Sequence, residues 1–376
     1  MGTTTSIRDK VLQSLLGRPG PVCSVYLRLE PRPQQVEDAR LRWQRLARQL
    51  TDEGADAAAV DALARRVDAE LPGSGTLVAF AAGGEIRYAA VLPPGHRGDT
   101  ADADFAAYGP LPHLQPLLAW RQDHPAHVLA VVDRTGADLE AYPLGGTEPI
   151  RRTVTGPDDE IERNAPGGMS QGRFQRRAED SWEHNAVRVA ETLTGVVSRV
   201  SARLVLLAGD VRAVQYLTKH LPERVRQQVS VRRVSGGRAA DGSDRVRSEQ
   251  VEEETRRAGD EQTSGLLRRF AEERGPGGRA VEGVHSTLRA LAEGRVETLV
   301  VVDDPGDRRT AWFGAAPGEV SERRPAAPSV DGTPMARAPL SDVAIRTALL
   351  SGSDVRVLRP DADGAPAHGI GALCRA

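Results

Sequence analysis

Short apolar runs alternate with amphipathic helical segments through the middle of this chain. The runs at residues 128–132 and 204–208 have the length of buried strands, and a turn at 133–136 leads into another strand at 137–142. Between them, apolar residues recur every three or four positions, as on one helix face: Trp182, Ala186, Val189, Leu193, Val196 and Val200. A helix at about 211–220 and a strand at 229–231 follow. This alternation predicts an α/β structure with a partly parallel sheet.

The first block also mixes strands with a helix. Its predicted elements are a strand at 22–29, a charged amphipathic helix at 35–50, and a hairpin of 76–82 with 86–92 through Gly83-Gly84. Leu41, Leu46 and Leu50 are among the apolar positions of that helix. Residues 93–116 are rich in Pro, Gly, Asp and His, and this composition predicts a loop or linker.

The third block follows the breaker Gly275-Pro276-Gly277-Gly278. Its predicted elements are a helical stripe formed by Val281, Val284, Leu288 and Leu291, a strand at 298–302, a helix at 340–350 and a strand at 355–358. A charged helix at about 249–273 precedes the breaker, and its Glu252 and Glu253 stand four residues before Arg256 and Arg257. We therefore predict an α/β fold of three domains, 1–122, 123–275 and 276–376. The last domain should be removable without unfolding the rest.

Composition narrows the class of protein. The 376 residues suffice for two or three domains, and 39% of them are hydrophobic. No apolar run approaches the roughly 18 residues of a membrane span, and the first twenty residues lack a signal peptide's apolar stretch. Cys23 and Cys374 match no metal-ligand spacing, so we expect a reducing cytoplasm, no metal and no cofactor. The net charge is −2, so any RNA contact must come from local patches of arginine.

One segment stands out by its chemistry. It reads Gly167-Gly168-Met169-Ser170-Gln171-Gly172-Arg173-Phe174-Gln175-Arg176-Arg177. Its paired glycines open backbone conformations that are closed to other residues, and its arginines have no acidic neighbour within the segment. Guanidinium groups bind phosphates in two-point fashion, so such a tip suits a narrow, phosphate-lined cavity. The alternative is a surface loop ahead of a helix, with solvated arginines.

The segment resembles the catalytic loop of the bacterial branch of the archaeal–eukaryotic class I release factors. This superfamily includes Pelota, quality-control peptidyl-tRNA hydrolases and Balon-like hibernation factors. Release factors carry a Gly-Gly-Gln tip, whereas the bacterial relatives carry a looser Gly-x-x-Gln or Gly-Ser-Gln tip that runs into Arg-Phe. Gly168-Met169-Ser170-Gln171 followed by Arg173-Phe174 fits the looser pattern. The ending Gly369-Ile370-Gly371-Ala372-Leu373 resembles the close of the third domain in these factors and in Pelota, which is related to ribosomal protein L7Ae.

The resemblance implies a release-factor-like α/β middle domain and an L7Ae-like α/β C-terminal domain. It implies binding to the ribosomal A site, with large-subunit rRNA, peptidyl-tRNA and a translational GTPase such as EF-Tu as partners. Gln171 is then the catalytic candidate, and the implied RNA-binding residues are Gly167, Gly168, Ser170, Gly172, Arg173, Gln175, Arg176 and Arg177. The first block lacks the Asn-Ile-Lys-Ser and Tyr-x-Cys-x-x-x-Phe patterns of stop-codon readers, so ordinary termination is not expected.

Three functions stay open from the sequence. In the first, slightly favoured because the codon-reading motifs and the strict Gly-Gly-Gln are absent, the loop occupies the peptidyl-transferase centre and protects hibernating ribosomes. In the second, the protein hydrolyses peptidyl-tRNA on stalled ribosomes. Because an amide cannot serve as a general base near neutral pH, Gln171 would act by orienting water. The third is a ribosome-independent α/β stress protein with a small-molecule pocket between the first two blocks.

Other constellations are weaker. His124 and His127 have a two-residue gap but no third metal ligand nearby, so capping or solvated histidines are expected. His184 on the helix after the glutamine segment is a second RNA-contact candidate, and Asp303-Asp304 before a proline is expected to form a turn. Residues 224–247 are rich in arginine and glycine and are interpreted as an exposed loop, either solvated or following RNA. No nucleotide-binding fingerprint occurs.

Overall fold

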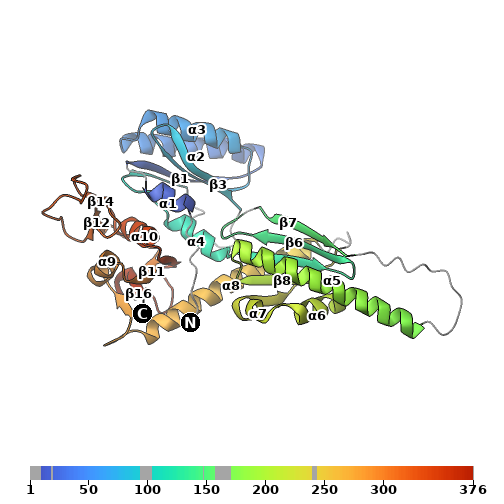
Figure 1. Ribbon diagram of the computed structural model, residues 1–376. Coiled ribbons are helices and arrows are strands. Elements are labelled where there is room, and N and C mark those ends of the chain that lie inside the picture. Colours follow the sequence, from blue (N-terminus) through green and yellow to red (C-terminus); the bar gives the residue numbers. More distant parts are fainter. Residues whose placement is uncertain are drawn as a thin grey trace. The chain divides into compact units, whose positions relative to one another are not determined.

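The computed structural model describes residues 10–17, 20–93, 104–146, 148–156, 171–238 and 244–375, with only the backbone for Lys10, residues 171–182 and Asp244. Helices and strands alternate, and the fold is α/β (Figure 1). The chain divides into two compact units, residues 1–120 with 263–376, and residues 121–262. The domain boundaries expected at residues 122 and 275 stay predictions. Among the described residues, no helix is long and apolar enough to cross a membrane.

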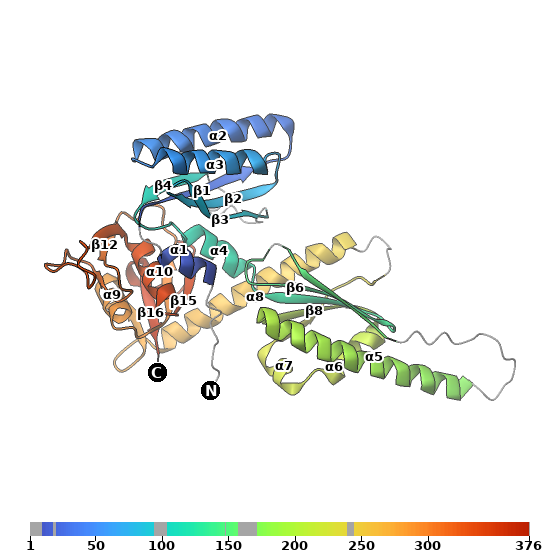
Figure 2. The same ribbon diagram turned by 45° about the horizontal axis from the view of Figure 1, so that its top comes forward.

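The first block contains an antiparallel sheet of order β3-β2-β1-β4. Its strands are β1 (Val22–Leu29), β2 (Gly75–Ala82), β3 (Glu85–Leu92) and β4 (Phe105–Gly109). Helices α2 (Pro33–Asp52) and α3 (Ala57–Glu70) cover one face (Figure 2), where Val25 and Leu27 are buried. Tyr26 and Phe80 are buried in a separate cluster that includes residues of α1 (Lys10–Gly17). Strand β1 is therefore buried on both faces.

Most elements predicted for this block are confirmed. The strand at 22–29 is β1, and Gly83 and Gly84 have φ of +57° and +78°, as the two residues of a tight hairpin turn require. The expected core position Leu41 is wrong, because that side chain is 45% exposed and Trp43 is buried instead. The loop expected at 93–116 is also wrong in part. Strand β4 pairs with β1 there, and α4 (Gln115–Asp123) begins before its end.

The third block contains two sheets, of order β10-β16-β11-β15 and β13-β12-β14. The strands are β10 (Ala280–Glu282), β11 (Val296–Val302), β12 (Thr310–Phe313), β13 (Val320–Ser321), β14 (Ala336–Pro339), β15 (Asp354–Leu358) and β16 (Ile370–Cys374). The helices are α9 (Val284–Ala292), α10 (Leu340–Leu350) and the 3₁₀ helix η2 (Ala367–Gly369). The predicted helix at 340–350 and the strands at 298–302 and 355–358 are confirmed. Val281 lies on β10, so its assignment to a helical stripe is wrong.

The first and third blocks share one hydrophobic core. Tyr26 of β1 and Phe80 of β2 belong to the same buried cluster as Leu291 of α9 and Val343 of α10. These residues lie within a single compact unit. The shared core contradicts the expectation that residues 276–376 can be removed without consequence, because their removal would expose apolar side chains of the first block to water.

A chain truncated after residue 275 should therefore lose order in its first block and keep it in the middle block. Amide hydrogen exchange is the measurement, since it reports local opening strand by strand. We expect fast exchange in β1 and β2, while the middle-sheet strands, whose core has no side chain from residues 276–376, keep their protection as an internal control. Unchanged protection in β1 and β2 would show that the first block folds alone.

A buried ion pair joins the same two blocks. His113 Nδ1 lies 3.0 Å from Oδ1 of Asp342 in the first turn of α10, and the Asp342 side chain is only 4% exposed. Tyr26 donates its hydroxyl to the His113 carbonyl at 2.7 Å, which fixes the histidine backbone. Burial alone would lower the pKa of His113, but the charge and hydrogen bond of Asp342, with a contribution from Asp303, raise it above 6.5.

Because the pKa of His113 is raised in the folded state, the stability from this pair is complete below pH of about 6.5 and is lost as pH rises through the raised value. We expect the unfolding free energy of this unit to fall as the solution passes from mildly acidic to mildly alkaline. Fluorescence of Trp43, Trp120 and Trp312 can follow denaturation, with Trp182→Phe silencing the other unit. Asp342→Asn should flatten the dependence, whereas Glu293→Gln, at a carboxyl whose pKa is lowered by Arg289 and Arg295, should leave it unchanged.

The middle block contains a five-stranded sheet of order β7-β6-β5-β8-β9. The strands are β5 (His127–Val132), β6 (Gly136–Tyr142), β7 (Ile150–Thr155), β8 (Leu204–Gly209) and β9 (Ser230–Arg233). Strands β5, β8 and β9 are parallel neighbours, and β6 is antiparallel to β5 and β7. Helices α5 (Gln171–Val200), α6 (Val211–His220) and α7 (Glu223–Gln228) pack on one face, and α8 (Asp244–Glu272) packs on the other.

The sequence pattern predicted this block well. Ala186, Val189, Leu193, Val196 and Val200 are all buried on α5, as expected. Strand β7 was not predicted, and α8 begins at residue 244 rather than at about 249. Arg256 pairs with Glu253, and Arg257 pairs with Glu254 and Glu261, while the pairing expected at four-residue spacing from Glu252 and Glu253 stays a prediction. The loop interpreted at 224–247 is wrong, since α7, β9 and the start of α8 occupy much of it.

Candidate functional site

Four strands of the middle sheet end at one edge. Because β6 is antiparallel to both neighbours, β7 runs in the same direction as β5, β8 and β9. Their carboxyl ends are Thr155, Val132, Gly209 and Arg233. In α/β sheets this edge is where ligands usually bind. The chain leaves the edge after β7 and is described again from the start of α5, so the segment singled out by the sequence is connected to this edge.

Some of the residues predicted from the sequence lie outside the described residues, and the others lie at the start of α5. Gly167, Gly168 and Ser170 lie outside the described residues, as does Met169 between them. The other predicted residues occupy the first two turns of α5, where the backbone alone is described: Gln171, Gly172, Arg173, Gln175, Arg176 and Arg177. The predicted glutamine segment is therefore helical from Gln171 onward, and Gln171 is the first residue of that helix.

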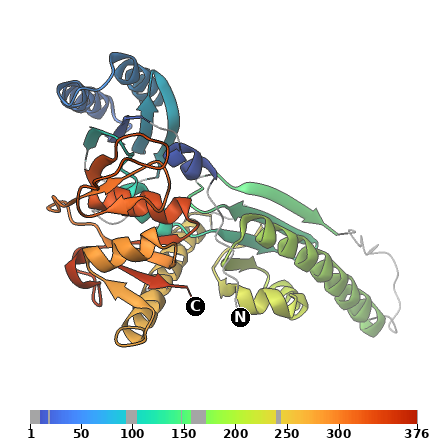
Figure 3. The ribbon, with the colours of Figure 1, turned by 60° about the vertical axis from the view of Figure 1, so that its left-hand side comes forward.

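Helix α5 projects beyond the sheet. The first buried side chain described along it is that of Asn185, which is 4% exposed. At a rise of about 1.5 Å per residue, Gln171 lies about 21 Å along the axis from Asn185. Figure 3 shows the beginning of α5 extending past the ends of the strands. The helix thus consists of an anchored part, packed on the sheet, and a projecting part that begins at Gln171.

Charged contacts brace α5 where it meets α6. Glu183 Oε1 accepts a hydrogen bond from Lys219 Nζ at 2.8 Å and lies 2.9 Å from His220 Nε2. The hydrogen bonds from Lys219 and His220 lower the pKa of Glu183, and the same contact raises the pKa of Lys219. Because these groups are partly exposed, the energy of the contact is modest. Its geometric effect is to join α6 to the beginning of the anchored part of α5.

A polar network organises the turn between β5 and β6. Asp133 Oδ1 accepts hydrogen bonds from the Thr135 N–H at 2.8 Å, the Gly136 N–H at 3.0 Å and Arg238 Nη1 at 3.0 Å. Arg238 also donates through Nε to Asp138 Oδ2 at 2.8 Å. Burial alone would raise the pKa of Asp133. The hydrogen bonds from Thr135 and Arg238 and the charge of Arg238 have the larger effect, so the pKa is lowered. This network connects the residues after β9 to the β5–β6 turn.

The same turn binds the residue just before the undescribed segment and a residue of the anchored part of α5. The Gly156 N–H, one residue after β7, donates to the Thr135 carbonyl at 2.7 Å. From α5, Asn185 Nδ2 donates to the Arg134 carbonyl at 3.0 Å. Neither Gly156 nor Asn185 was identified from the sequence. The available signal was a polar residue, Asn185, next to Ala186 within the apolar stripe of the helix.

The remaining sequence candidates have structural roles or lie apart from this edge. His127 is buried and stacks on Tyr142 with ring centroids 4.6 Å apart, and burial lowers its pKa. His184 is an exposed residue of α5. Asp303 accepts a hydrogen bond from Gln115 at 2.9 Å, and Asp304 forms the expected turn with the Gly306 N–H. Within the described ranges, no group of three His, Cys, Asp or Glu side chains could hold a metal ion.

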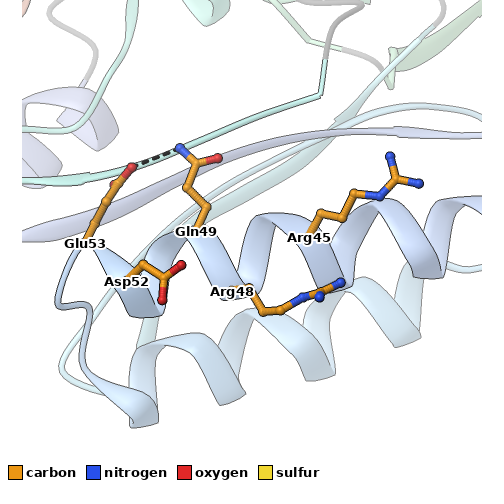
Figure 4. A pocket seen from close by; sticks show the side chains of 5 residues that line it. All are labelled: Arg45, Arg48, Gln49, Asp52 and Glu53. Atoms are coloured by element: carbon orange, nitrogen blue, oxygen red, sulfur yellow. Dashed lines mark hydrogen bonds between the residues drawn. The ribbon is translucent and has the colours of Figure 1, made fainter.

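A shallow depression on the first block has a different character. Its lining residues belong to the end of α2 and to the residue that follows it (Figure 4): Arg45, Arg48, Gln49, Asp52 and Glu53. Gln49 donates to the Ala106 carbonyl at 2.8 Å, and Glu53 accepts from the Tyr108 N–H at 2.8 Å. These two side chains therefore bind the outer backbone groups of edge strand β4 and block further strand pairing there. We interpret this feature as the capping of a sheet edge.

One family model matches the part of the chain that contains the middle sheet and α5. Residues 126–276 match the sequence model of the bacterial archaeo-eukaryotic release factor family 2. Over these residues the chain is similar to a release factor family. Two uncharacterized proteins from strains of Mycobacterium tuberculosis, MT2704 and Rv2629, are each 28% identical over 98% of this chain and 97% of their own length.

Solved structures of an archaeal termination factor and of Pelota proteins resemble the chain weakly. Archaeal termination factor aRF1 is 16% identical over 98% of this chain and 97% of its own, with a TM-score of 0.26. Pelota from Archaeoglobus fulgidus is 14% identical over 80% of this chain and 78% of its own, with a TM-score of 0.29. Ribosome-bound archaeal Pelota, described together with ABCE1, is 14% identical over 99% and 94%, with a TM-score of 0.39. At these scores no residue of this chain is positioned by the likeness.

Proposed function

We propose that this release-factor-like protein binds the ribosomal A site in the cytoplasm, places the segment around Gln171 in the peptidyl-transferase centre and protects idle ribosomes. The observation that carries the proposal is the match of residues 126–276 to a release factor family, the same part of the chain from which α5 projects. Large-subunit rRNA is the proposed partner, with a translational GTPase such as EF-Tu assisting delivery.

The shape of the projecting part suits a narrow RNA cavity. A single α-helix with its side chains is about 10–12 Å wide, so only a slender element enters the site. The sequence of its first two turns has three arginines and no acidic residue. Arginine binds phosphates through paired hydrogen bonds, and the amino end of a helix carries partial positive charge. Both properties favour contact with the phosphate backbone of rRNA.

A second candidate function is hydrolysis of peptidyl-tRNA on stalled ribosomes. The observation in its favour is that Gln171 is the first residue of α5. Amides in the first turn of a helix stabilise anions, so an oxygen that gains charge next to Gln171 would lie in a favourable field. Gln171 would orient the attacking water, which is catalysis by positioning rather than by proton transfer. The ribosome-independent alternative predicts that the protein stays in the supernatant when ribosomes are pelleted.

Replacing Arg173, Arg176 and Arg177 together with alanine should lower the affinity for ribosomes. Each phosphate contact releases counterions from the RNA when it forms. With fewer such contacts, the affinity should also depend less steeply on salt concentration. Co-sedimentation with vacant 70S ribosomes across a series of salt concentrations measures both effects. A matched variant, Arg188→Ala with Arg199→Ala and Arg224→Ala, removes the same charge from exposed positions of the same unit. Equal losses in the two variants would indicate a nonspecific charge effect and contradict the assignment.

Gln171→Ala separates the protective role from catalysis. In the hydrolase, loss of one positioning group should slow peptide release about 100-fold or more while ribosome affinity is retained, since the group acts mainly in the transition state. In the protective factor, neither the wild type nor the variant releases peptide, yet both block aminoacyl-tRNA entry. Single-turnover release from ribosomes loaded with peptidyl-tRNA is the measurement. Rapid release by the variant would contradict both roles for Gln171.

A further inference from the structure

We infer that Asn185 and Gly156 are positioning residues that set the direction in which α5 leaves the sheet, and hence where Gln171 lies. This inference rests on the proposed function for its biological consequence. Its physical basis is independent, because both residues and their partners belong to the described part of the middle unit. Gly156 is the last described residue before the segment, and Asn185 is the first buried residue along α5 after it.

Asn185 is an unusual residue for the buried face of a helix. Burying an amide is unfavourable unless it is hydrogen-bonded, and Asn185 satisfies only its donor, through the Arg134 carbonyl at 3.0 Å. Its Oδ1 is buried with no hydrogen-bond partner among the described residues. An apolar side chain would pack here at lower cost. The presence of an amide at this position is explained if its hydrogen bond to the Arg134 carbonyl fixes α5 against the β5–β6 turn.

Gly156 makes the contact from the other end of the segment. A Cβ atom at this position would lie 1.9 Å from Asn185 Oδ1 and 2.2 Å from its Cγ, so any larger residue would displace the amide. The Gly156 N–H donates to the Thr135 carbonyl at 2.7 Å. Gly156 after β7 and Asn185 of α5 are thus bound to the neighbouring carbonyls of Thr135 and Arg134, and they are in contact with each other.

The geometry gives this junction a strong effect on the far end of the helix. With about 21 Å between Asn185 and Gln171, a change of about 10° in the direction of α5 would move Gln171 by about 4 Å. A misplacement of about 1 Å in a catalytic group costs about 100-fold in rate. A small loosening at the junction is therefore enough to remove Gln171 from its working position, without loss of any surface that binds the ribosome.

The direction of α5 can be measured without ribosomes. Spin labels at Arg177→Cys on α5 and Arg152→Cys on β7 report the distance between the projecting helix and the sheet, and both natural cysteines are buried. We expect a narrow distance distribution in the full chain and a broadened one, or one shifted by about 4 Å, after Asn185→Ala. The control is Thr194→Ala, another buried polar residue of α5, whose hydroxyl bonds only to its own helix at Ala190. An unchanged distribution in Asn185→Ala would overturn the inference.

A double-mutant cycle tests the contact itself. Gly156→Ala alone should disturb the distribution, because its new methyl group meets the Asn185 amide. In the Asn185→Ala background that group is gone, so Gly156→Ala should have little further effect. Such non-additivity is expected of residues in direct contact. Additive shifts would indicate that the two residues act independently and would contradict the junction.

The functional readout separates positioning from stability. On ribosomes that carry peptidyl-tRNA, Asn185→Ala should lose less affinity in sedimentation than the triple arginine variant, because it retains all three guanidinium groups. Its effect at the peptidyl-transferase centre, protection from puromycin or release of peptide, should fall at least 10-fold, about 1.4 kcal/mol. A shifted helix with an unchanged effect at that centre would overturn the positioning role. If the wild type fails to sediment with ribosomes, the proposed function fails, and the spin-label distances alone decide the junction.

Discussion

The carboxylate of Asp133 is the contact on which the carboxyl edge of the middle sheet depends. Its Oδ1 accepts hydrogen bonds from the Thr135 N–H and hydroxyl, both at 2.8 Å, and from the Gly136 N–H and Arg238, both at 3.0 Å. The turn between β5 and β6 is thereby held in one geometry, and its Arg134 and Thr135 carbonyls accept hydrogen bonds from Asn185 of α5 and from Gly156 after β7. A charged acceptor makes such bonds stronger than neutral ones, so this turn is a rigid base for the projecting helix.

Sequence patterns predicted the elements whose burial follows a simple period. The stripe from Ala186 to Val200 on α5 and the strands at 128–132 and 204–208 are confirmed, because apolar periodicity directly records which face meets the core. The helix at 340–350 is found with the expected bounds. The similarity of residues 126–276 to a release factor family was also recognisable, since a few residues around Gln171 carry most of the resemblance.

Features that depend on tertiary partners were not predictable. Strands β4 and β7 are short edge strands. The sequence of β7 is partly polar, and β4 is a run of only five residues inside a segment whose composition is that of a loop, so neither has a clear strand pattern. The core shared by the first and third blocks joins segments more than 150 residues apart, and a glycine-rich breaker between blocks says nothing about contact in space. Asn185 looked like an ordinary polar helix residue. Its role appears only when Gly156 and the Arg134 carbonyl are placed beside it.

The anchored part of α5 also explains why its projecting part is helical. Starting a helix in water is unfavourable, whereas extending an existing one adds a hydrogen bond for each residue fixed. The first two turns, with a glycine at residue 172 and several like-charged arginines, would not form a stable helix alone. They continue a helix already fixed by the buried residues from Asn185 onward. Binding of phosphates would remove the repulsion among the arginines, so the free energy of RNA contact would also stabilise the helix that carries Gln171.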